Sequence, residues 1–109
     1  MPLYVQPNRK VSLSDMMSFQ RDHFQGTEYD KTLDVGAGPF GSPFRFNPLY
    51  WEYEGKPYLN ERSIEVVQTG FSFIAQSRNW LPNPIGGISW FGVDDTNSTV
   101  YTHFYCSIS

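Results

Sequence analysis

A dense stretch of turn and strand residues at positions 76–95 constrains this chain more than any other part of it. The stretch holds one Arg, two Asn, two Trp, two Pro, a Gly pair and an Asp pair. Proline fixes the backbone and glycine frees it, while Arg and Trp are frequent anchors of binding surfaces. We therefore expect a shaped loop that leads into a strand, and we expect function to be found there first.

The length and charge of the chain narrow the classes of protein it can be. Its 109 residues amount to a single domain or part of one, and 39% of them are hydrophobic and 17% aromatic. The net charge is −3, and the eight basic residues are spread along the chain without forming a run. A nucleic-acid partner is therefore not expected.

Membrane, disulfide and metal chemistry are also not expected. No apolar run is long enough to cross a bilayer, and residues 1–7 lack the basic and apolar regions of a signal peptide. Cys106 is the single cysteine, so it can form no internal disulfide and no multi-cysteine metal site. His23 and His103 are the two histidines, and a zinc site would need carboxylates from elsewhere.

One segment near the start predicts a helix. Ser12 or Ser14 can cap it, Asp15 lies in its first turn, and Gly26 can end it. The apolar and amide residues at helical spacing are Leu13, Met16, Met17, Gln20 and Phe24. We expect this stripe to face the core.

From Gly26 to about Pro48 the chain is rich in turn residues. Residues 36–41 match the spelling of a dinucleotide-binding fingerprint, which requires its last glycines to open a helix. Pro39 and Pro43 make that helix improbable, so a tight, irregular loop is expected instead.

The rest of the chain predicts strands. Residues 50–53 and 58–59 flank a turn at 54–57 and predict a hairpin, and the β-branched and aromatic run at 63–76 is interrupted by Gly70. Residues 88–94 and 99–106 predict two strands that are joined by 95–98. The fold class is therefore α+β, mainly antiparallel β with one N-terminal helix.

The last predicted strand is followed by no closing element, which is typical of a fragment. Exposed ladder groups at a sheet edge favour pairing, so we expect a homo-oligomer or association with missing segments.

Two other groups of reactive residues suggest catalysis less strongly. His103 and Cys106 are an odd number of residues apart, so on one strand they would point to opposite faces, and a half-buried structural Cys106 is expected. Asp95 is expected to be a turn residue, and the role of Asp94 stays open.

The candidate site comprises Arg78, Asn79, Trp80, Gly86 and Gly87. Arg presents a planar fork that suits a carboxylate, and Asn can donate to a developing oxyanion. The alternative for Arg78 is an exposed side chain stacked on Trp80. The glycine pair either admits a ligand or another backbone, or it forms a flexible turn.

Four blocks of the sequence together resemble a known family: residues 21–27, 36–43, 68–71 and 76–95. Their residues and order are similar to the cysteine-dependent dipeptidases among the N-terminal-nucleophile (Ntn) hydrolases, over practically the whole chain. The resemblance implies a four-layered αββα sandwich and a hydrolase that cleaves dipeptides with an N-terminal Cys. It implies no metal or organic cofactor.

This chain begins with Met1-Pro2 and resembles an interior portion of the family, so no position matches the nucleophile and no catalytic residue is assigned. The resemblance therefore implies a partial domain, residues 1–109, that supplies strands and a substrate-side loop and is inactive alone. The alternatives are a noncatalytic β-rich binding module, which would use Arg78, Trp80 and Trp90 as anchors, and a self-associating remnant.

Overall fold

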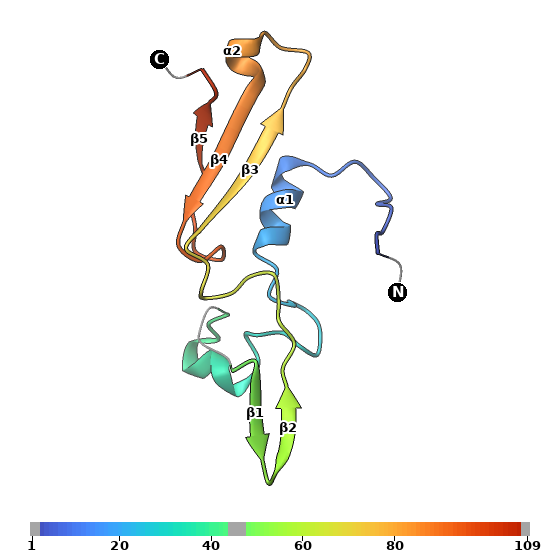
Figure 1. The fold of residues 1–109 in the computed structure, drawn as a ribbon, viewed down its shortest axis with the longest axis vertical. Coiled ribbons are helices and arrows are strands. Elements are labelled where there is room, and N and C mark those ends of the chain that lie inside the picture. Colours follow the sequence, from blue (N-terminus) through green and yellow to red (C-terminus); the bar gives the residue numbers. More distant parts are fainter. Residues whose placement is uncertain (1–2, 44–47, 108–109) are drawn as a thin grey trace.

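A computed structural model describes residues 3–43 and 48–107 of the chain. The molecule is elongated, with extents of 62 × 32 × 23 Å, and its two antiparallel sheets lie toward opposite ends (Figure 1). No helix in the described part of the chain is long and apolar enough to span a membrane. The fold class α+β with antiparallel pairing is confirmed.

The larger sheet has three strands in the order β3-β4-β5: β3 (Phe71–Ser77), β4 (Gly87–Val93) and β5 (Thr102–Tyr105). Both pairings are antiparallel, with Phe71 opposite Val93 and Trp90 opposite His103. The predicted strand at 88–94 is confirmed to within a residue, whereas β5 is shorter than the predicted 99–106 at both ends.

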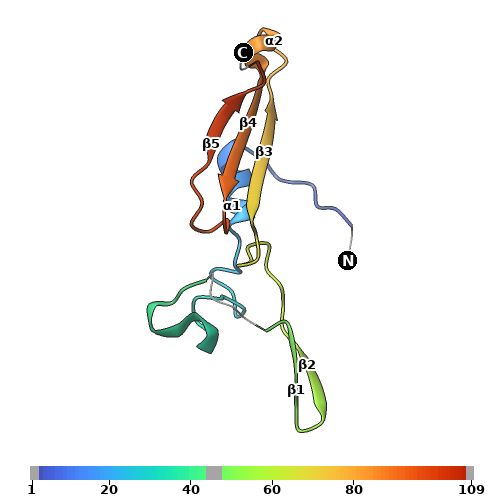
Figure 2. The ribbon, with the colours of Figure 1, turned by 60° about the vertical axis from the view of Figure 1, so that its left-hand side comes forward.

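The two faces of this sheet differ in exposure. On one face Ser72, Ile74, Ile88 and Gly92 are buried, and helix α1 (Leu13–Gln20) and the 94–101 connection lie against it (Figure 2). On the other face the large apolar side chains stay exposed. Side chains alternate between the faces of a strand, so one layer of the sheet is covered and the other is bare.

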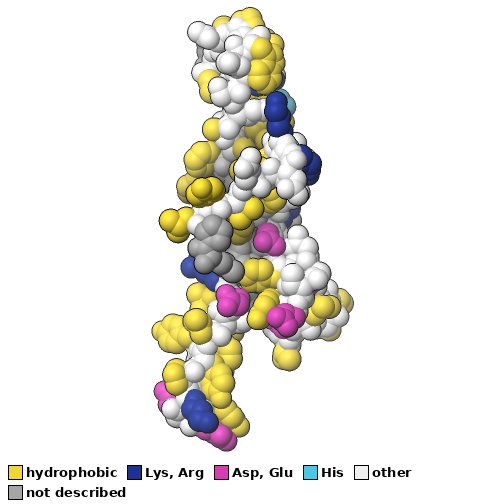
Figure 3. All heavy atoms as spheres, turned by 90° about the vertical axis from the view of Figure 1, so that its right-hand side faces the viewer, with side chains coloured by type: hydrophobic (Ala, Val, Ile, Leu, Met, Phe, Trp, Pro, Cys, Tyr) yellow, Lys and Arg dark blue, Asp and Glu magenta, His cyan; other side chains and the backbone are white. Residues whose placement is uncertain are grey.

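Few apolar side chains are buried. Ala37, Ile74 and Ile88 are the buried hydrophobic residues in the described part of the chain. Hydrophobic side chains instead reach the surface along much of the molecule's length (Figure 3). The buried polar residues are Ser63, Glu65, Ser72, Asp95, Thr96 and Thr99.

Helix α1 begins as predicted and ends early. Ser12 is its N-cap, and its side chain and that of Asp15 form a reciprocal capping box. The predicted extension to Gly26 is wrong, because the helix ends at Gln20 and Phe24 has a φ of 64°. Asp22 Oδ1 accepts a hydrogen bond from the Phe24 backbone N–H, and this local bond competes with a continued helix.

The predicted core-facing stripe is confirmed only in part, because Leu13, Met17 and Gln20 are half-buried and Met16 is exposed. No residue of this helix is buried, and Met16 is 40% exposed. The last residue of the helix is bonded to the sheet and to the 94–101 connection: Gln20 Nε2 donates to the Phe73 carbonyl at 3.4 Å, and Gln20 O accepts from Thr96 Oγ1 at 2.5 Å. Polar contacts therefore contribute to the attachment of this helix.

The glycine-rich stretch forms an irregular 3-10 segment, η1 (Val35–Phe40), as the prolines predicted. Gly38 breaks the helical geometry within it, with φ 67° and ψ −168°. Asp34 caps the segment through Ala37 N, and Gly41 ends it in the left-handed region. No helix opens at these glycines to receive a pyrophosphate.

The smaller sheet is the predicted hairpin, β1 (Tyr50–Tyr53) with β2 (Lys56–Leu59). Glu54 and Gly55 both have positive φ, as a two-residue type I′ turn requires. Every residue of both strands is exposed, and the hairpin projects away from the larger sheet (Figure 1).

The predicted strand at residues 63–76 is wrong in its first half, because β3 begins only at Phe71. Glu65 N donates to the Asp22 carbonyl at 2.9 Å, and Ser63 Oγ donates to the Glu65 carbonyl at 2.5 Å. These bonds fold residues 63–70 against the loop after α1, so this segment leaves the sheet.

Candidate functional site

The structure brings the five predicted site residues together at the tip of the β3-β4 unit. Residues 78–86 connect the two strands and include the one-turn helix α2 (Asn83–Gly86) at the far end of the molecule (Figure 1). Prolines lie at the start of α2. The N–H groups of a first helical turn have no partner within the helix, so a proline there costs no hydrogen bond. The dense sequence segment is therefore a shaped loop between two strands, as predicted.

Arg78 holds this loop closed with its backbone. Its N–H donates to the Gly86 carbonyl at 2.8 Å, and its carbonyl accepts from Leu81 N at 3.1 Å. These two bonds fix both ends of the turn that presents residues 79 and 80. The backbone of Arg78 thus sets the shape of the loop.

The guanidinium of Arg78 is also used inside the loop. Its Nη2 donates to the Ile85 carbonyl, and the group lies 6.0 Å from the centre of the Tyr105 ring. The ring that receives Arg78 is therefore Tyr105 of β5, whereas the sequence suggested Trp80. Arg78 Nε is buried and meets no acceptor among the described residues, so one donor of the fork is left for a further polar group.

Both glycines of the pair lie where another atom comes close. A Cβ built on Gly86 would lie 3.3 Å from the Arg78 carbonyl oxygen, and one on Gly87 would lie 2.8 Å from Cys106 Sγ. Neither residue has a positive φ. At Gly86 the backbone of Arg78 comes close, which agrees with the close-approach interpretation. At Gly87 the nearby atom is the end of the exposed Cys106 side chain.

The loop offers a mixed surface to solvent. Trp80 is 74% exposed, Ile85 is 46% exposed, and Asn79 is exposed beside them. An exposed indole next to an amide can contact an apolar side chain and a carbonyl of the same ligand. The side chains at the tip are therefore of the kinds found on binding surfaces, and the loop backbone that carries them is held by hydrogen bonds.

Cys106 departs from its prediction. The sequence indicated a half-buried residue in a strand, but β5 ends at Tyr105 and Cys106 lies exposed in the turn that follows. The backbone N–H of Cys106 donates to the Gly87 carbonyl at 3.2 Å, so Cys106 borders the tip loop.

His103 lies in β5 between two aromatic side chains. The centre of its ring is 5.4 Å from that of Trp90 and 5.9 Å from that of Tyr105.

Asp95 is confirmed as a turn residue. Its Oδ1 accepts from Asn97 N at 2.9 Å and from Ser98 N at 3.0 Å, and its side chain is buried. Asp94 is exposed and has a φ of 67°. The two carboxylates therefore serve the β4-β5 connection rather than forming a catalytic pair.

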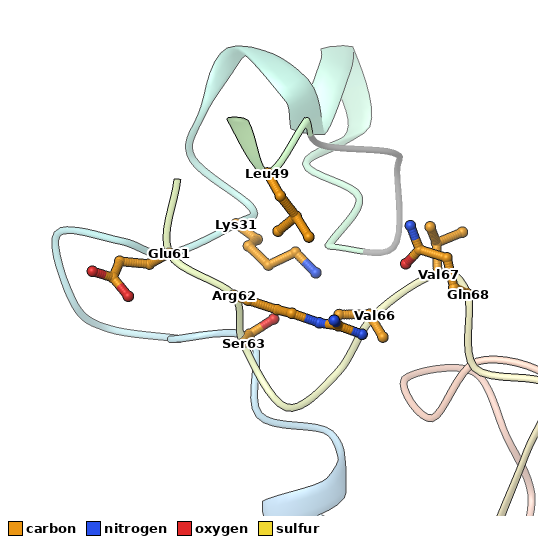
Figure 4. Close-up of a pocket in the computed structure, with 8 residues that line it drawn as sticks. All are labelled: Lys31, Leu49, Glu61, Arg62, Ser63, Val66, Val67 and Gln68. Atoms are coloured by element: carbon orange, nitrogen blue, oxygen red, sulfur yellow. The ribbon is translucent and has the colours of Figure 1, made fainter. Parts of the chain in front are cut away.

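Sequence reasoning missed a buried ion pair near the middle of the molecule. Lys31 Nζ lies 2.8 Å from Glu65 Oε2 and also donates to the Glu65 carbonyl. The two residues are 34 positions apart in loops, so no spacing rule could have paired them. Lys31 and Arg62 reach into an adjoining cavity of about 30 Å³ (Figure 4).

This cavity lies far from the tip loop, and the Ser63 hydroxyl at its wall donates to the Glu65 carbonyl. Its lining residues are Lys31, Leu49, Glu61, Arg62, Ser63, Val66, Val67 and Gln68. It has room for about one water molecule. The described residues also contain no group of three or more His, Cys, Asp or Glu side chains that could hold a metal ion.

The large pKa shifts lie outside the tip as well. Hydrogen bonds from Thr32 and from the backbone of Gly26 lower the pKa of Asp30 to about 2. The Arg9 guanidinium and the Ser12 cap hold the pKa of Asp15 well below its usual range. Both shifts belong to local turns, so they indicate structural carboxylates.

Comparison with known proteins places the chain in a family. The model of peptidase family C69 matches residues 1–109. A probable dipeptidase of Salmonella dublin is 29% identical over 104 residues, 95% of this chain and 19% of the relative. One of Latilactobacillus sakei is 29% identical over 92 residues, 84% of this chain and 16% of the relative.

The chain thus spans about a fifth of the length of these curated relatives, and no solved structure matches it. The family model covers the tip loop, the three-stranded sheet and α1 together. With its whole length matched, the chain belongs to peptidase family C69.

Proposed function

We propose that this dipeptidase-related chain corresponds to part of a dipeptidase, to which it supplies strands and a substrate-side loop. The observation that carries the proposal is the tip loop, in which internal hydrogen bonds fix the backbone while Asn79 and Trp80 stay exposed. Binding groups on a fixed backbone lose little entropy when a ligand is held. The proposed ligand is a dipeptide.

In the complete enzyme the proposed nucleophile is an N-terminal Cys that this chain does not contain. Its thiol attacks the peptide carbonyl, and its own α-amine, which titrates near neutrality, takes the thiol proton. The α-ammonium returns that proton to the leaving nitrogen as the C–N bond breaks, which releases the amine product and leaves a thioester. Water then hydrolyses the thioester and restores the thiol. This chemistry uses no metal and no organic cofactor.

Within that scheme the residues of the tip have separate roles. Asn79 donates its amide N–H to a carbonyl of the substrate, and Trp80 packs on an apolar side chain. Arg78 acts mainly as a positioning residue, because its backbone and Nη2 are bonded within the loop. Its buried Nε remains available to a polar group of the substrate or of the remaining polypeptide.

The finer fold proposal is that the three-stranded sheet forms one inner layer of an Ntn-type αββα sandwich. Helix α1 lies on one face of the sheet, and the bare opposite face carries apolar side chains. Such a face is the kind that packs on a second sheet in a sandwich. That second sheet would belong to polypeptide outside residues 1–109.

The test is made in a full-length dipeptidase polypeptide that contains this segment, carrying Arg78→Ala or Arg78→Lys. We expect Arg78→Ala to reduce kcat/KM for dipeptides at least tenfold, mainly through KM, because the loop that presents Asn79 and Trp80 loses its bond to the Ile85 carbonyl. Arg78→Lys keeps the charge but not the fork, so we expect an intermediate loss.

A matched control is Arg9→Ala, which removes an exposed arginine whose ion pair with Asp15 lies at the start of α1. We expect its kcat and KM to be unchanged. Unchanged activity and unchanged substrate affinity in Arg78→Ala would remove the proposed role of the tip loop.

A second candidate function is a noncatalytic binding module, favoured by the exposure of Trp80 on the same loop. The two candidates differ when the chain is joined in frame to a Cys-led segment of a relative. Dipeptide hydrolysis by the joined polypeptide supports the dipeptidase proposal, and its absence in a folded product supports the binding module.

A further inference from the structure

One face of the three-stranded sheet carries five large apolar side chains, and we call it the bare face: Phe71, Phe73, Phe91, Val93 and Phe104. The register places them together, since Phe71 lies opposite Val93, Phe73 lies opposite Phe91, and Phe104 lies opposite Ser89 two residues before Phe91. Directly opposed residues of antiparallel strands project to the same face.

The bare face is large for a molecule of this size. Its five side chains are between 37% and 64% exposed. With roughly 200 Å² for a phenylalanine, they leave on the order of 500 Å² of apolar surface. The largest apolar patch of a typical monomer is about 300–600 Å² and is often functional, so the bare face is a candidate interaction surface.

The bare face also carries no charge. The smaller residues that share it are Ala75, Ser77, Ser89 and Thr102. An occupant must therefore be uncharged and apolar, because an unpaired charge buried against phenylalanines would be strongly unfavourable. A second copy of the bare face is uncharged and apolar over its whole area. In a two-fold dimer the same surface of each copy contacts that of the other, so no charge is buried.

The area of the bare face also fits a second copy of the chain. Two bare faces together would bury about 1,000 Å² from the large side chains alone, near the lower bound for a specific interface. Neighbouring small residues add to this area. The aromatic hairpin β1-β2 has charges at Glu52, Glu54 and Lys56, so it fits the bare face less well.

We propose that two copies of this 109-residue chain pair bare face to bare face about a two-fold axis, as two stacked sheets. The inference goes beyond the proposed function, because it concerns the isolated chain and not a complete enzyme. The partner copy supplies the layer that the remaining polypeptide would supply there. Helix α1 of each copy then lies on the outside.

The first experiment measures the mass of the isolated chain by sedimentation equilibrium over a concentration series, for the unchanged chain and for Phe73→Lys. We expect a monomer–dimer equilibrium, and at least a tenfold weaker dimer in Phe73→Lys, because the lysine would be buried without a partner. Phe40→Lys is the matched control: Phe40 is 94% exposed in η1, outside the sheet, so its dimer should be unchanged.

Far-UV circular dichroism establishes that each variant is folded, and Phe104→Ser provides a second, milder change on the bare face. We expect Phe104→Ser to weaken the dimer by a smaller factor than Phe73→Lys. A dimer that neither change on the bare face weakens would overturn the proposal, as would a monomer over the whole series or an assembly larger than a dimer.

The second experiment locates the contact. In a Cys106→Ser background, Ala75→Cys puts the single thiol at the middle of the bare face, and Ser14→Cys puts it on the exposed side of α1. A bismaleimide of about 10 Å, the usual separation of stacked sheets, should link two copies of the first variant and not of the second. Equal linking of both variants contradicts the proposal. Neither experiment measures hydrolysis, so failure here leaves the dipeptidase proposal standing.

Discussion

At the scale of single residues, the most constrained side chain is a charged one. Glu65 is fully buried, and its Oε2 lies 2.8 Å from Lys31 Nζ, whereas its Oε1 has no hydrogen-bond partner in the described part of the chain. A buried carboxylate is tolerated only when it is paired, so the loop around it depends on Lys31. This pair joins the segment before η1 to the segment before β3.

Replacing Glu65 by Gln leaves the largely buried ammonium of Lys31 without its counter-charge. We expect the free energy of unfolding to fall by about 3 kcal/mol, measured by urea denaturation at fixed protein concentration. In the double variant Lys31→Met, Glu65→Gln no charge is buried, so part of this loss should be recovered.

The control for this prediction is Glu61→Gln, since Glu61 belongs to the same loop but is exposed. Its effect should stay within about 0.5 kcal/mol. Equal destabilisation by the two glutamate changes would mean that the ion pair contributes nothing specific.

The lowered pKa of Asp30 predicts that the stability of the fold depends on pH. Its pKa is lowered from 3.8 to about 2, first by the hydrogen bond from Thr32 Oγ1 and then by the backbone N–H groups of Gly26 and Thr32. A lowered pKa in the folded state means that the stabilisation is fully present above the unfolded value and is lost as the pH falls through the folded one.

We therefore expect Asp30→Asn to lower the urea midpoint by its full amount above about pH 4, and the difference to shrink as the pH falls and to vanish below about pH 2. Thr32→Val removes the largest cause of the shift, so it should narrow that pH window. A midpoint difference that is as large at pH 2 as at pH 7 would show that the carboxylate charge is not what stabilises the turn.

The sequence predicted residues whose bonds are local and missed those whose partners are distant. Asp95 was recognisable because its bonds reach only two and three positions along the chain. The contact of Arg78 with Tyr105 and the pair of Lys31 with Glu65 join segments 27 and 34 positions apart, and nothing in a single sequence reports such distances. The substrate-binding role of residues 78–80 stays a prediction.

At the scale of elements, the hairpin and the strand β4 were predictable because turn chemistry and side-chain alternation are local signals. The end of α1 was not, since competing bonds from Asp22 decide it. Residues 63–70 have the composition of a strand, but the burial of Glu65 folds them away from the sheet. Tertiary contacts override strand propensity there.

The β4-β5 connection is packed closely on strand β4, and this predicts a test. A Cβ added at Gly92 would lie 2.5 Å from Thr99 Oγ1, and Thr99 Oγ1 donates to the Val93 carbonyl. We expect Gly92→Ala to lower the free energy of unfolding by about 2 kcal/mol, because overpacking forces the connection outward. Chemical denaturation monitored by circular dichroism measures the change.

Gly70→Ala is the matched control, because a Cβ at Gly70 meets no atom within 4 Å and Gly70 has no positive φ. Its effect should be close to zero or slightly stabilising. A Gly92→Ala chain as stable as the Gly70→Ala chain would mean that the connection moves aside at no cost.

At the scale of the whole molecule, the chain covers little of its own apolar surface. Its radius of gyration is 17.9 Å, whereas a compact domain of this length has about 13 Å. The aromatic content of 17% indicated a core only if the fold gathers the rings, and most of them remain exposed. Composition cannot report this outcome, because it depends on which surfaces a partner covers.

The attachment of α1 to the sheet has a consequence for the order of events during synthesis. The Gln20 carbonyl accepts from Thr96, Gln20 Oε1 accepts from Tyr101, and Arg21 donates to the Thr99 carbonyl. These partners are made 76 to 81 residues after the helix. The helix therefore gains these three bonds only after the β4-β5 connection has been synthesised, so their formation is a late step in the folding of this segment.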